Sequence, residues 1–401
     1  MAYDVDAVRA HFPALKAGVA HFDGPGGSQV PDVVGEAVAS ALTSPIANRG
    51  QVTAAERTAD DIVTGARAAI ADLLGAVPGG VIFGRSMTQL TYDISRALAA
   101  AWGPGDEVVV SRLDHDANVR PWVQAAEAVG ATVRWVEFDR DTTELTTEDV
   151  RRALTPSTML VAVTGASNLL GTRPDLPSIS AAVHEAGALL YVDGVHLTPH
   201  APVDIAALGA DFFACSPYKF LGPHCGVVVA RPQLLETLHP AKLLPSTDAV
   251  PERFELGTLP YELLAGVTAA VDFHATLDGD TVGSRRDRLV AGLRALEAHE
   301  ETLRGQLEAG VAVLSGVTVH SRAAVRTPTL LLTFADRSAA DAYVFLAERG
   351  VNAPAGSFYA IEPSRWIGLG DAGGLRVGLA PYSTGADVDR LLAGLAQFLG
   401  S

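Results

Sequence analysis

Short runs of Val, Ile and Leu alternate along residues 60–230 with stretches that have the apolar spacing of amphipathic helices. A parallel strand is buried on both faces, so it reads as a continuous apolar run, and a helix then returns the chain to the starting edge of the sheet. The pattern therefore predicts an α/β domain with a mostly parallel, doubly wound sheet of seven strands. The predicted strands are 80–83, 107–111, 132–138, 159–164, 188–193, 212–216 and 226–230.

Beyond residue 261 the regular alternation of strand and helix stops. We expect helices near 261–276, 284–314 and 338–349, strands at 329–334 and 375–379, and a last helix capped by Ser383 or Thr384. This mixture predicts a smaller α+β domain over residues 262–401. Residues 21–261 would form the large cofactor-binding domain, and residues 1–20 would be an N-terminal segment that joins the small domain.

Charge and composition narrow the classes of partner. The chain of 401 residues is 48% hydrophobic and carries a net charge of -16, which disfavours nucleic acid and anionic membrane surfaces. No apolar run reaches the roughly 18 residues of a membrane span, and no basic leader precedes an apolar stretch. Cys215 and Cys225 suit a reducing compartment and lack metal-ligand spacing. We therefore expect a cytoplasmic protein without a metal.

Polar side chains that can bind a cofactor follow five of the predicted strands. In an open α/β sheet, ligands bind beyond the carboxyl ends of the strands. We therefore expect one site that collects these side chains at a single edge of the sheet. The residues concerned are Ser86, Thr88, His115, Asn168, Asp193, His196, Ser216 and Lys219.

Lys219 and Asp193 indicate which cofactor this site binds. A lysine amine forms a Schiff base with the aldehyde of pyridoxal 5'-phosphate, and a buried carboxylate keeps the ring nitrogen protonated so that the ring accepts electrons. Either residue alone is more typical of a solvated loop. The turn 83–88 could bind phosphate at a helix N-terminus, or Ser86 could simply cap that helix.

Nine short motifs, in the same order along nearly the whole chain, resemble the aminotransferase class V family. The resemblance is to its cysteine desulfurase-like branch, whose members are pyridoxal phosphate enzymes of fold type I. The lysine motif reads Ser-Pro-Tyr-Lys at 216–219. The nine motifs lie at 21–27, 48–50, 83–88, 114–118, 167–171, 193–196, 216–219, 257–258 and 376–379.

The resemblance implies a role for each matching residue. Lys219 would hold the cofactor and carry the catalytic proton, Asp193 would pair with the ring nitrogen, and His115 would stack on the ring. Thr258 would reach the phosphate of a neighbouring subunit, which implies a homodimer, and Arg376 would bind the carboxylate of an amino-acid substrate. The other cofactor contacts would be Ser86, Met87, Thr88, Asn168, His196, Ser216 and Tyr218, and Asn168, Asn48 and Tyr359 would lie near the substrate.

Three positions depart from the desulfurases of this family. They usually have glutamine where His196 stands and histidine where Tyr218 stands. Their persulfide-forming cysteine lies on a loop where this chain has Tyr359, and a phenol cannot attack the substrate sulfur. Cys215 and Cys225 both fall in apolar strand contexts, which are typical of buried structural thiols.

We therefore expect a pyridoxal phosphate enzyme that acts on an α-amino acid after covalent linkage of its amine to the cofactor. The favoured reaction is a β-elimination of the carbon-sulfur lyase type that needs no protein thiol. An aminotransferase and an amino-acid epimerase are alternatives that use the same first steps. A non-catalytic cofactor-binding protein is an alternative from another class.

Overall fold

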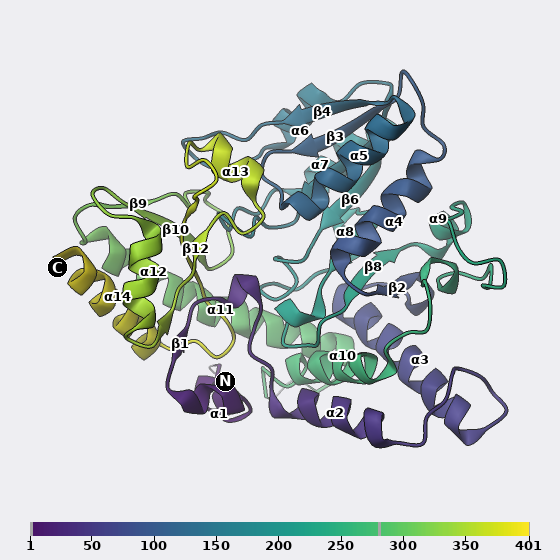
Figure 1. The fold of residues 1–401 in the computed structure, drawn as a ribbon, viewed down its shortest axis with the longest axis horizontal. Coiled ribbons are helices and arrows are strands. Elements are labelled where there is room, and N and C mark those ends of the chain that lie inside the picture. Colours follow the sequence, from purple (N-terminus) through teal and green to yellow (C-terminus); the bar gives the residue numbers. More distant parts are fainter. Residues whose placement is uncertain (1–2, 280–281, 401) are drawn as a thin grey trace.

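A seven-stranded sheet forms the centre of the computed structural model, which describes residues 3–279 and 282–400 (Figure 1). Residues 1–2, 280–281 and 401, which belong to the predicted N-terminal segment and small domain, lie outside the described residues. The strand order is β2-β8-β7-β6-β5-β3-β4. The strands are β2 Val81–Gly84, β3 Glu107–Ser111, β4 Thr132–Val136, β5 Thr158–Thr164, β6 Leu189–Asp193, β7 Phe212–Cys215 and β8 Gly226–Ala230.

The predicted parallel character of this sheet is confirmed. Strands β4, β3, β5, β6 and β7 pair in parallel, and only β8 runs antiparallel to its neighbours β7 and β2. Several strand ends differ from the prediction by one residue, and the end of β4 differs by two. Gly80 ends a 3-10 turn before β2, and β4 stops at Val136, which is paired with the last residue of β3.

Helices cover both faces of the sheet, as a doubly wound fold requires. The core beneath α4 and α5 contains Ile82, Val108 and Val110, whereas the core beneath α3, α7 and α10 contains Val81 and Val109. Neighbouring strand residues therefore point to opposite cores. The helices up to residue 274 are α1 Val5–Ala10, α2 Asp32–Thr43, α3 Ala54–Leu74, α4 Met87–Ala99, α5 Arg120–Val129, α6 Thr147–Ala153, α7 Leu176–Glu185, α8 Ile205–Leu208, α9 Pro232–Glu236 and α10 Tyr261–His274.

A second, antiparallel sheet of four strands follows, in the order β12-β13-β10-β9. Its members are β9 Val317–Val319, β10 Thr329–Phe334, β12 Ala355–Gly356 and β13 Gly374–Gly378. Near the N-terminus, β1 Ala20–His21 pairs in parallel with β11 Val351–Asn352. The remaining helices are α11 Arg285–Ala312, α12 Ala339–Ala347, α13 Ile361–Trp366 and α14 Gly385–Gly400. Over the described ranges, no helix is long and apolar enough to cross a bilayer.

The last helix illustrates why these segments fold where they do. Thr384 accepts a hydrogen bond from the N–H of Asp387, and the Asp387 carboxylate accepts one from the N–H of Thr384, which together form a capping box. Of the two predicted caps, Thr384 is therefore the one used. The apolar stripe of α14 packs on the four-stranded sheet through Val388, Leu391, Leu395 and Phe398.

The two sheets meet at the carboxyl ends of the large sheet's parallel strands. Asp23 forms a bridge with Gly378 of β13, and a Cβ at Gly378 would lie 2.1 Å from the ring of Pro25. This close approach brings β13 and the N-terminal segment 23–27 against the edge where the site was expected. A side chain at residue 378 would force them apart.

Candidate active site

A cavity of about 540 Å³ lies beyond the carboxyl ends of the large sheet's strands. Ten of the residues predicted from sequence line it, and they come from segments that follow five different strands. The structure therefore brings these residues together at one edge of the sheet, as predicted. The ten are Ser86, Met87, Thr88, His115, Asn168, Asp193, His196, Ser216, Tyr218 and Lys219.

The turn between β2 and α4 supplies a ready anion site. The Ser86 hydroxyl caps α4 by accepting a hydrogen bond from the N–H of Gln89 at 3.1 Å, so the predicted capping role is confirmed. The first turn of a helix offers free N–H groups and the positive end of the dipole. Gly226 permits this arrangement, since a Cβ there would lie 2.1 Å from the Ser86 carbonyl carbon.

Asp193 ends β6 with its carboxylate buried at the cavity wall. Its Oδ1 accepts a hydrogen bond from the Val195 N–H at 2.9 Å. Burial raises the pKa of this carboxyl to about 6, against the lowering effects of that hydrogen bond and of Lys219. A cationic ring nitrogen beside the carboxylate would stabilise its charged form, which burial disfavours.

Lys219 faces the same cavity from the 3-10 turn that follows β7. Its Nζ donates a hydrogen bond to the carbonyl oxygen of Pro25. Burial is the main cause that lowers the pKa of its ammonium to about 7, and the Arg376 charge adds to the effect. A large share of the amine is therefore neutral near neutral pH, which is the nucleophilic form.

His115 lies on the turn after β3 and is held there by buried polar contacts. Its Nδ1 accepts a hydrogen bond from the Ala117 N–H at 3.0 Å, and burial lowers its pKa to about 4. The neighbouring Asp114 binds Ser111 and Asn118. The ring is thus neutral and fixed in orientation, as a ring that stacks on another aromatic ring must be.

These observations fit pyridoxal phosphate. A buried carboxylate, a partly neutral lysine amine, a neutral imidazole and a helix N-terminus line one cavity. Within the described residues, the Oδ1 atom of Asn168 and the Nδ1 atom of His196 are buried without a hydrogen-bond partner. Orphaned polar atoms at a cavity wall are costly unless a bound molecule satisfies them.

Arg376 lies beside this cavity without lining it. Its side chain is only 2% exposed, and its Nη1 donates a hydrogen bond to the backbone oxygen of Asn168 at 3.1 Å. The Phe358 ring stacks on the guanidinium, with 3.7 Å between the ring centroid and Cζ. Its buried Nε has no partner among the described residues, so a donor is available for a carboxylate.

The loop that carries Phe358 and Tyr359 has an unusual backbone. Both residues have positive φ angles, 53° and 58°, a region that disfavours side chains with a Cβ. Three contacts hold the loop: Asn168 Nδ2 donates to the Phe358 oxygen, the Asp116 N–H donates to the Tyr359 oxygen, and Phe358 stacks on Arg376. The Tyr359 side chain is 78% exposed and lies 5.7 Å from the His115 ring.

The other two predicted residues, Asn48 and Thr258, do not line the cavity of their own chain. Asn48 is exposed, and Thr258 lines a separate cavity of about 1040 Å³ on the outer side of β2, with Phe83, Arg85 and Leu256. In a single chain, neither residue contacts the cavity beside Lys219.

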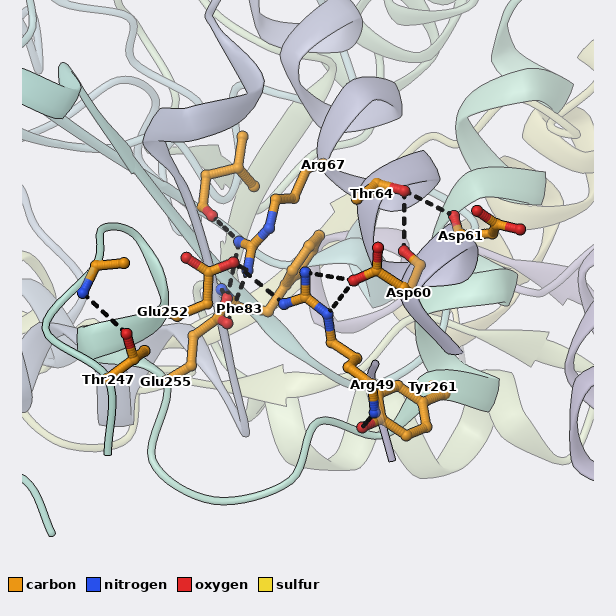
Figure 2. Close-up of polar contacts among 12 residues, drawn as sticks. Arg49, Asp60, Asp61, Thr64, Arg67, Phe83, Thr247, Glu252, Glu255 and Tyr261 are labelled. Atoms are coloured by element: carbon orange, nitrogen blue, oxygen red, sulfur yellow. Dashed lines mark hydrogen bonds and ion pairs between the residues drawn. The ribbon is translucent and has the colours of Figure 1, made fainter. Parts of the chain in front are cut away.

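An ion-pair network anchors both of these outer segments to β2, the strand that leads into the turn before α4 (Figure 2). Glu255 accepts hydrogen bonds from the Phe83 N–H and from Arg67, which also reaches Glu252. Arg49 bridges Glu252, at 3.1 Å, and Asp60 of α3. The segments that bear Asn48 and Thr258 are therefore fixed relative to the strand that leads into the turn.

Five cavity residues were missed by the sequence analysis. Pro25, Ala117, Thr164, Ala166 and Val195 line the cavity but contribute backbone or small side chains. Thr164 is the exception, since it ends β5 as Asp193 ends β6, and the strand-end argument could have found it. Pro25 lies within the matching motif at 21–27, but nothing in the sequence shows that its carbonyl oxygen accepts a hydrogen bond from Lys219.

Comparisons with known proteins agree with this picture. A model of the aminotransferase class-V family matches residues 20–391. The chain is 35% identical to Mycobacterium tuberculosis protein MT3887, covering 99% of this chain and 100% of that protein. It is 31% identical to the aminotransferase-like protein FGM3 of Gibberella zeae, with 99% of each chain covered. It is 32% identical to a probable cysteine desulfurase of Pseudomonas aeruginosa, with 98% and 97% covered.

A solved structure gives the same result for the fold. The cysteine desulfurase CsdA of Escherichia coli matches with a TM-score of 0.88 at 26% identity, covering 100% of this chain and 99% of that one. The predicted family resemblance and the predicted fold class are thereby confirmed.

The depressed pKa of Lys219 generates a pH prediction for cofactor-free protein. Because only the neutral amine captures the aldehyde, the rate of covalent pyridoxal phosphate capture should rise with pH and level off above about pH 7. Stopped-flow absorbance from about pH 5.5 to about pH 10.5 would measure the rate, on the order of tenfold slower at one pH unit below the pKa. A profile that still rises steeply up to about pH 10, the ordinary range of a lysine, would contradict it.

The identity of the capturing residue is tested in parallel. Lys219→Ala should abolish the borohydride-reducible linkage, whereas Lys242→Ala should keep it. Peptide mapping that finds the reduced adduct on Lys16 or Lys242 would show that the assignment is wrong.

Proposed function

We propose that the chain, which belongs to the aminotransferase class V family and is a pyridoxal-phosphate-dependent enzyme, catalyses β-elimination from a small or medium α-amino acid without using a protein thiol. The observation that carries this proposal is the pairing of a cavity lined by side chains suited to the cofactor with buried cysteines. Cys215 and Cys225 are both buried, and burial raises the pKa of each thiol, that of Cys225 to about 12. A thiolate, the nucleophilic form, is disfavoured at both positions.

Each cavity residue has a task in this proposal. The bound cofactor supplies an electron sink that stabilises negative charge at the substrate α-carbon. Lys219 holds the cofactor covalently at rest and, once released, removes the α-proton with its Nζ. Asp193 keeps the ring nitrogen protonated, and His115 stacks on the ring. The first turn of α4, with Ser86, Met87 and Thr88, and the Ser216 hydroxyl bind the phosphate.

Substrate recognition would depend on groups beside the cavity. Arg376 binds the α-carboxylate through its unpartnered Nε edge, and Asn168 orients substrate and cofactor through its free amide oxygen. The loop with Phe358 and Tyr359 covers this end of the cavity and screens the reacting atoms from water. His196 and Tyr218 complete the wall on the side of the cofactor hydroxyl and the lysine.

The exposed Tyr359 supports a route without persulfide. The loop position at which the family's desulfurases carry their sulfur acceptor holds a phenol in this chain. Expulsion of a β-substituent transfers the leaving group to solvent and yields a keto acid and ammonia, so it requires no acceptor on the protein.

An aminotransferase is the second candidate, and one observation favours it. The relative FGM3, which matches 99% of this chain, is named an aminotransferase-like protein. The same cavity would serve, with the α-proton returned to the cofactor instead of loss of a β-substituent. Return of the proton on the opposite face would make an epimerase.

The assembly follows from the positions of Asn48 and Thr258. Both are fixed on the outer side of β2 and α3, and the exposed apolar side chains of Val52, Leu244 and Leu256 lie on the same or adjoining segments. We infer a homodimer in which these segments meet the neighbouring site, with Thr258 contacting its phosphate. We also infer that the enzyme acts in the cytoplasm, on a small-molecule substrate.

Product analysis tests the reaction type. Purified holoenzyme is screened with amino acids for a change in the cofactor absorbance, and the products of each responding substrate are identified. Release of a keto acid with ammonia supports elimination, and dependence on an amino acceptor identifies an aminotransferase. Inversion at the α-carbon without either product identifies an epimerase.

Asp193→Asn should fold and retain cofactor but lose activity by about 10²–10³-fold, because the ring nitrogen is no longer kept cationic. A matched control is Asp211→Asn, another buried carboxylate of the same sheet, which binds the Leu190 N–H far from the cavity. Steady-state rates and cofactor spectra measure both variants. Wild-type turnover of Asp193→Asn would refute the proposed pairing.

The Cys215→Ala, Cys225→Ala double variant should bind cofactor and turn over within a few-fold of wild type, since its cost is limited to packing. Incubation with cysteine should leave no persulfide on either thiol of the wild-type enzyme, as judged by mass spectrometry. A persulfide on Cys225, together with loss of sulfur release in Cys225→Ala while cofactor stays bound, would restore a desulfurase mechanism.

A further inference from the structure

His196 connects the cofactor cavity to polar groups behind it. The residue lines the cavity and is 2% exposed. Its Nε2 lies 3.0 Å from the hydroxyl oxygens of both Thr327 and Thr329, at the start of β10. Its Nδ1 has no partner among the described residues and is the ring nitrogen left for the cofactor side. Both nitrogens of the ring therefore face groups that can exchange protons.

A second cavity, here called the rear cavity, lies on the far side of the threonines. It measures about 580 Å³, and Thr327, His200 and Glu300 line it together with the exposed Val325 and Glu301. Its polar lining offers the two to four partners that a water molecule needs. The exposed lining residues show that it reaches the molecular surface.

Glu300 and His200 form a buried pair at the wall of the rear cavity. Glu300 is 1% exposed, and its Oε2 lies 2.8 Å from the Nδ1 of His200. The His200 ring packs edge-on against His196, with ring centroids 5.0 Å apart. The second oxygen of Glu300, Oε1, is buried without a partner among the described residues, so the carboxylate retains an unused acceptor.

We propose that His196, Thr327 and Thr329 form a proton route from the cofactor cavity to the rear cavity, where the His200–Glu300 pair accepts the proton. The proposal rests on the function proposed above, because it concerns protons that are released at the cofactor. The route gives protons a second path to the solvent, one that avoids the loop with Phe358 and Tyr359.

The reaction needs such an exchange. A substrate arrives as an ammonium ion and must lose one proton before its amine can replace Lys219, while the departing amine or ammonia takes one up. On the outward step His196 receives a proton at Nδ1 and gives its Nε2 proton to a threonine hydroxyl. The hydroxyl passes its own proton through water in the rear cavity to the His200–Glu300 pair. The return step reverses each transfer and restores the first tautomer of the ring.

The charged surroundings are compatible with this route. Burial, His200, Arg376 and Lys219 all lower the pKa of His196, so the ring stays neutral and passes protons without holding a charge. The hydroxyls of Tyr3 and Tyr382 also interact with Glu300, and burial, together with the Glu300 charge, raises the pKa of both. Arg173, Arg304 and Arg326 at the rear cavity contact Glu297, Glu301 and Glu308.

Rapid pH jumps on the holoenzyme test the route without turnover. The absorbance of the covalently bound cofactor reports when a proton reaches it. The Thr327→Val, Thr329→Val double variant keeps the side-chain shape and removes the hydroxyls, and Glu300→Gln removes the acceptor. Each should slow the absorbance relaxation by at least about tenfold, in line with the usual effect of a proton-transfer group. Added formate should restore the rate of Glu300→Gln.

Two matched variants control for structural damage. Thr333→Val removes a hydroxyl on the same strand, β10, that bonds His320 at 2.8 Å and not His196. Glu297→Gln removes a carboxylate from the wall of the same rear cavity that pairs with Arg173. Both should relax at the wild-type rate.

The outcomes separate this inference from the function on which it rests. Wild-type relaxation in Glu300→Gln and in the threonine variant, with the reducible linkage on Lys219 intact, overturns the route alone. Slowing that is equal in the two controls also overturns it, because the effect would then be structural. A wild-type protein with no reducible linkage on Lys219 overturns both proposals. If Glu300→Gln fails to fold, the threonine variant decides.

Discussion

The burial of Asp193 and Lys219 at one cavity is the constraint on which the site depends. An anion and an amine are both removed from water, and burial shifts the pKa of each toward its neutral form. Such a pair is unfavourable for folding alone. In the proposed function it would become favourable, because the ligand would supply a cationic ring nitrogen to Asp193 and an aldehyde to Lys219. The strand ends of β6 and β7 hold the two groups ready for that ligand.

The sequence predicted the fold and the cavity walls because both follow from local pattern. Apolar runs locate the strands, and the parallel sheet brings residues such as Asp193, Ser216 and Lys219 to one edge by topology alone. Periodicity also placed β10 and the stripe of α14. The family match adds that the chain is an enzyme, so the alternative of a non-catalytic binding protein is set aside.

The sequence could not predict contacts between segments that are distant along the chain. The hydrogen bond of Asn168 to Phe358, the carbonyl of Pro25 at Lys219 and the threonines behind His196 all join residues more than a hundred positions apart. These contacts depend on how the two sheets meet, and residue type does not encode that geometry. Asn48 and Thr258 were also predicted at the site, but neither lines the cavity of its own chain.

The left-handed backbone at Phe358 and Tyr359 has an energetic consequence. The left-handed conformation of each of these residues costs about 1–2 kcal/mol relative to a right-handed one. The loop keeps this shape because Asn168 and Arg376 hold it. In the function proposed above, a substrate would use the free Nε of Arg376 and the free Oδ1 of Asn168, so it would leave the contacts that offset the strain in place. The two side chains proposed to bind the substrate are therefore also the ones that shape the loop, so a change at either of them is expected to alter both.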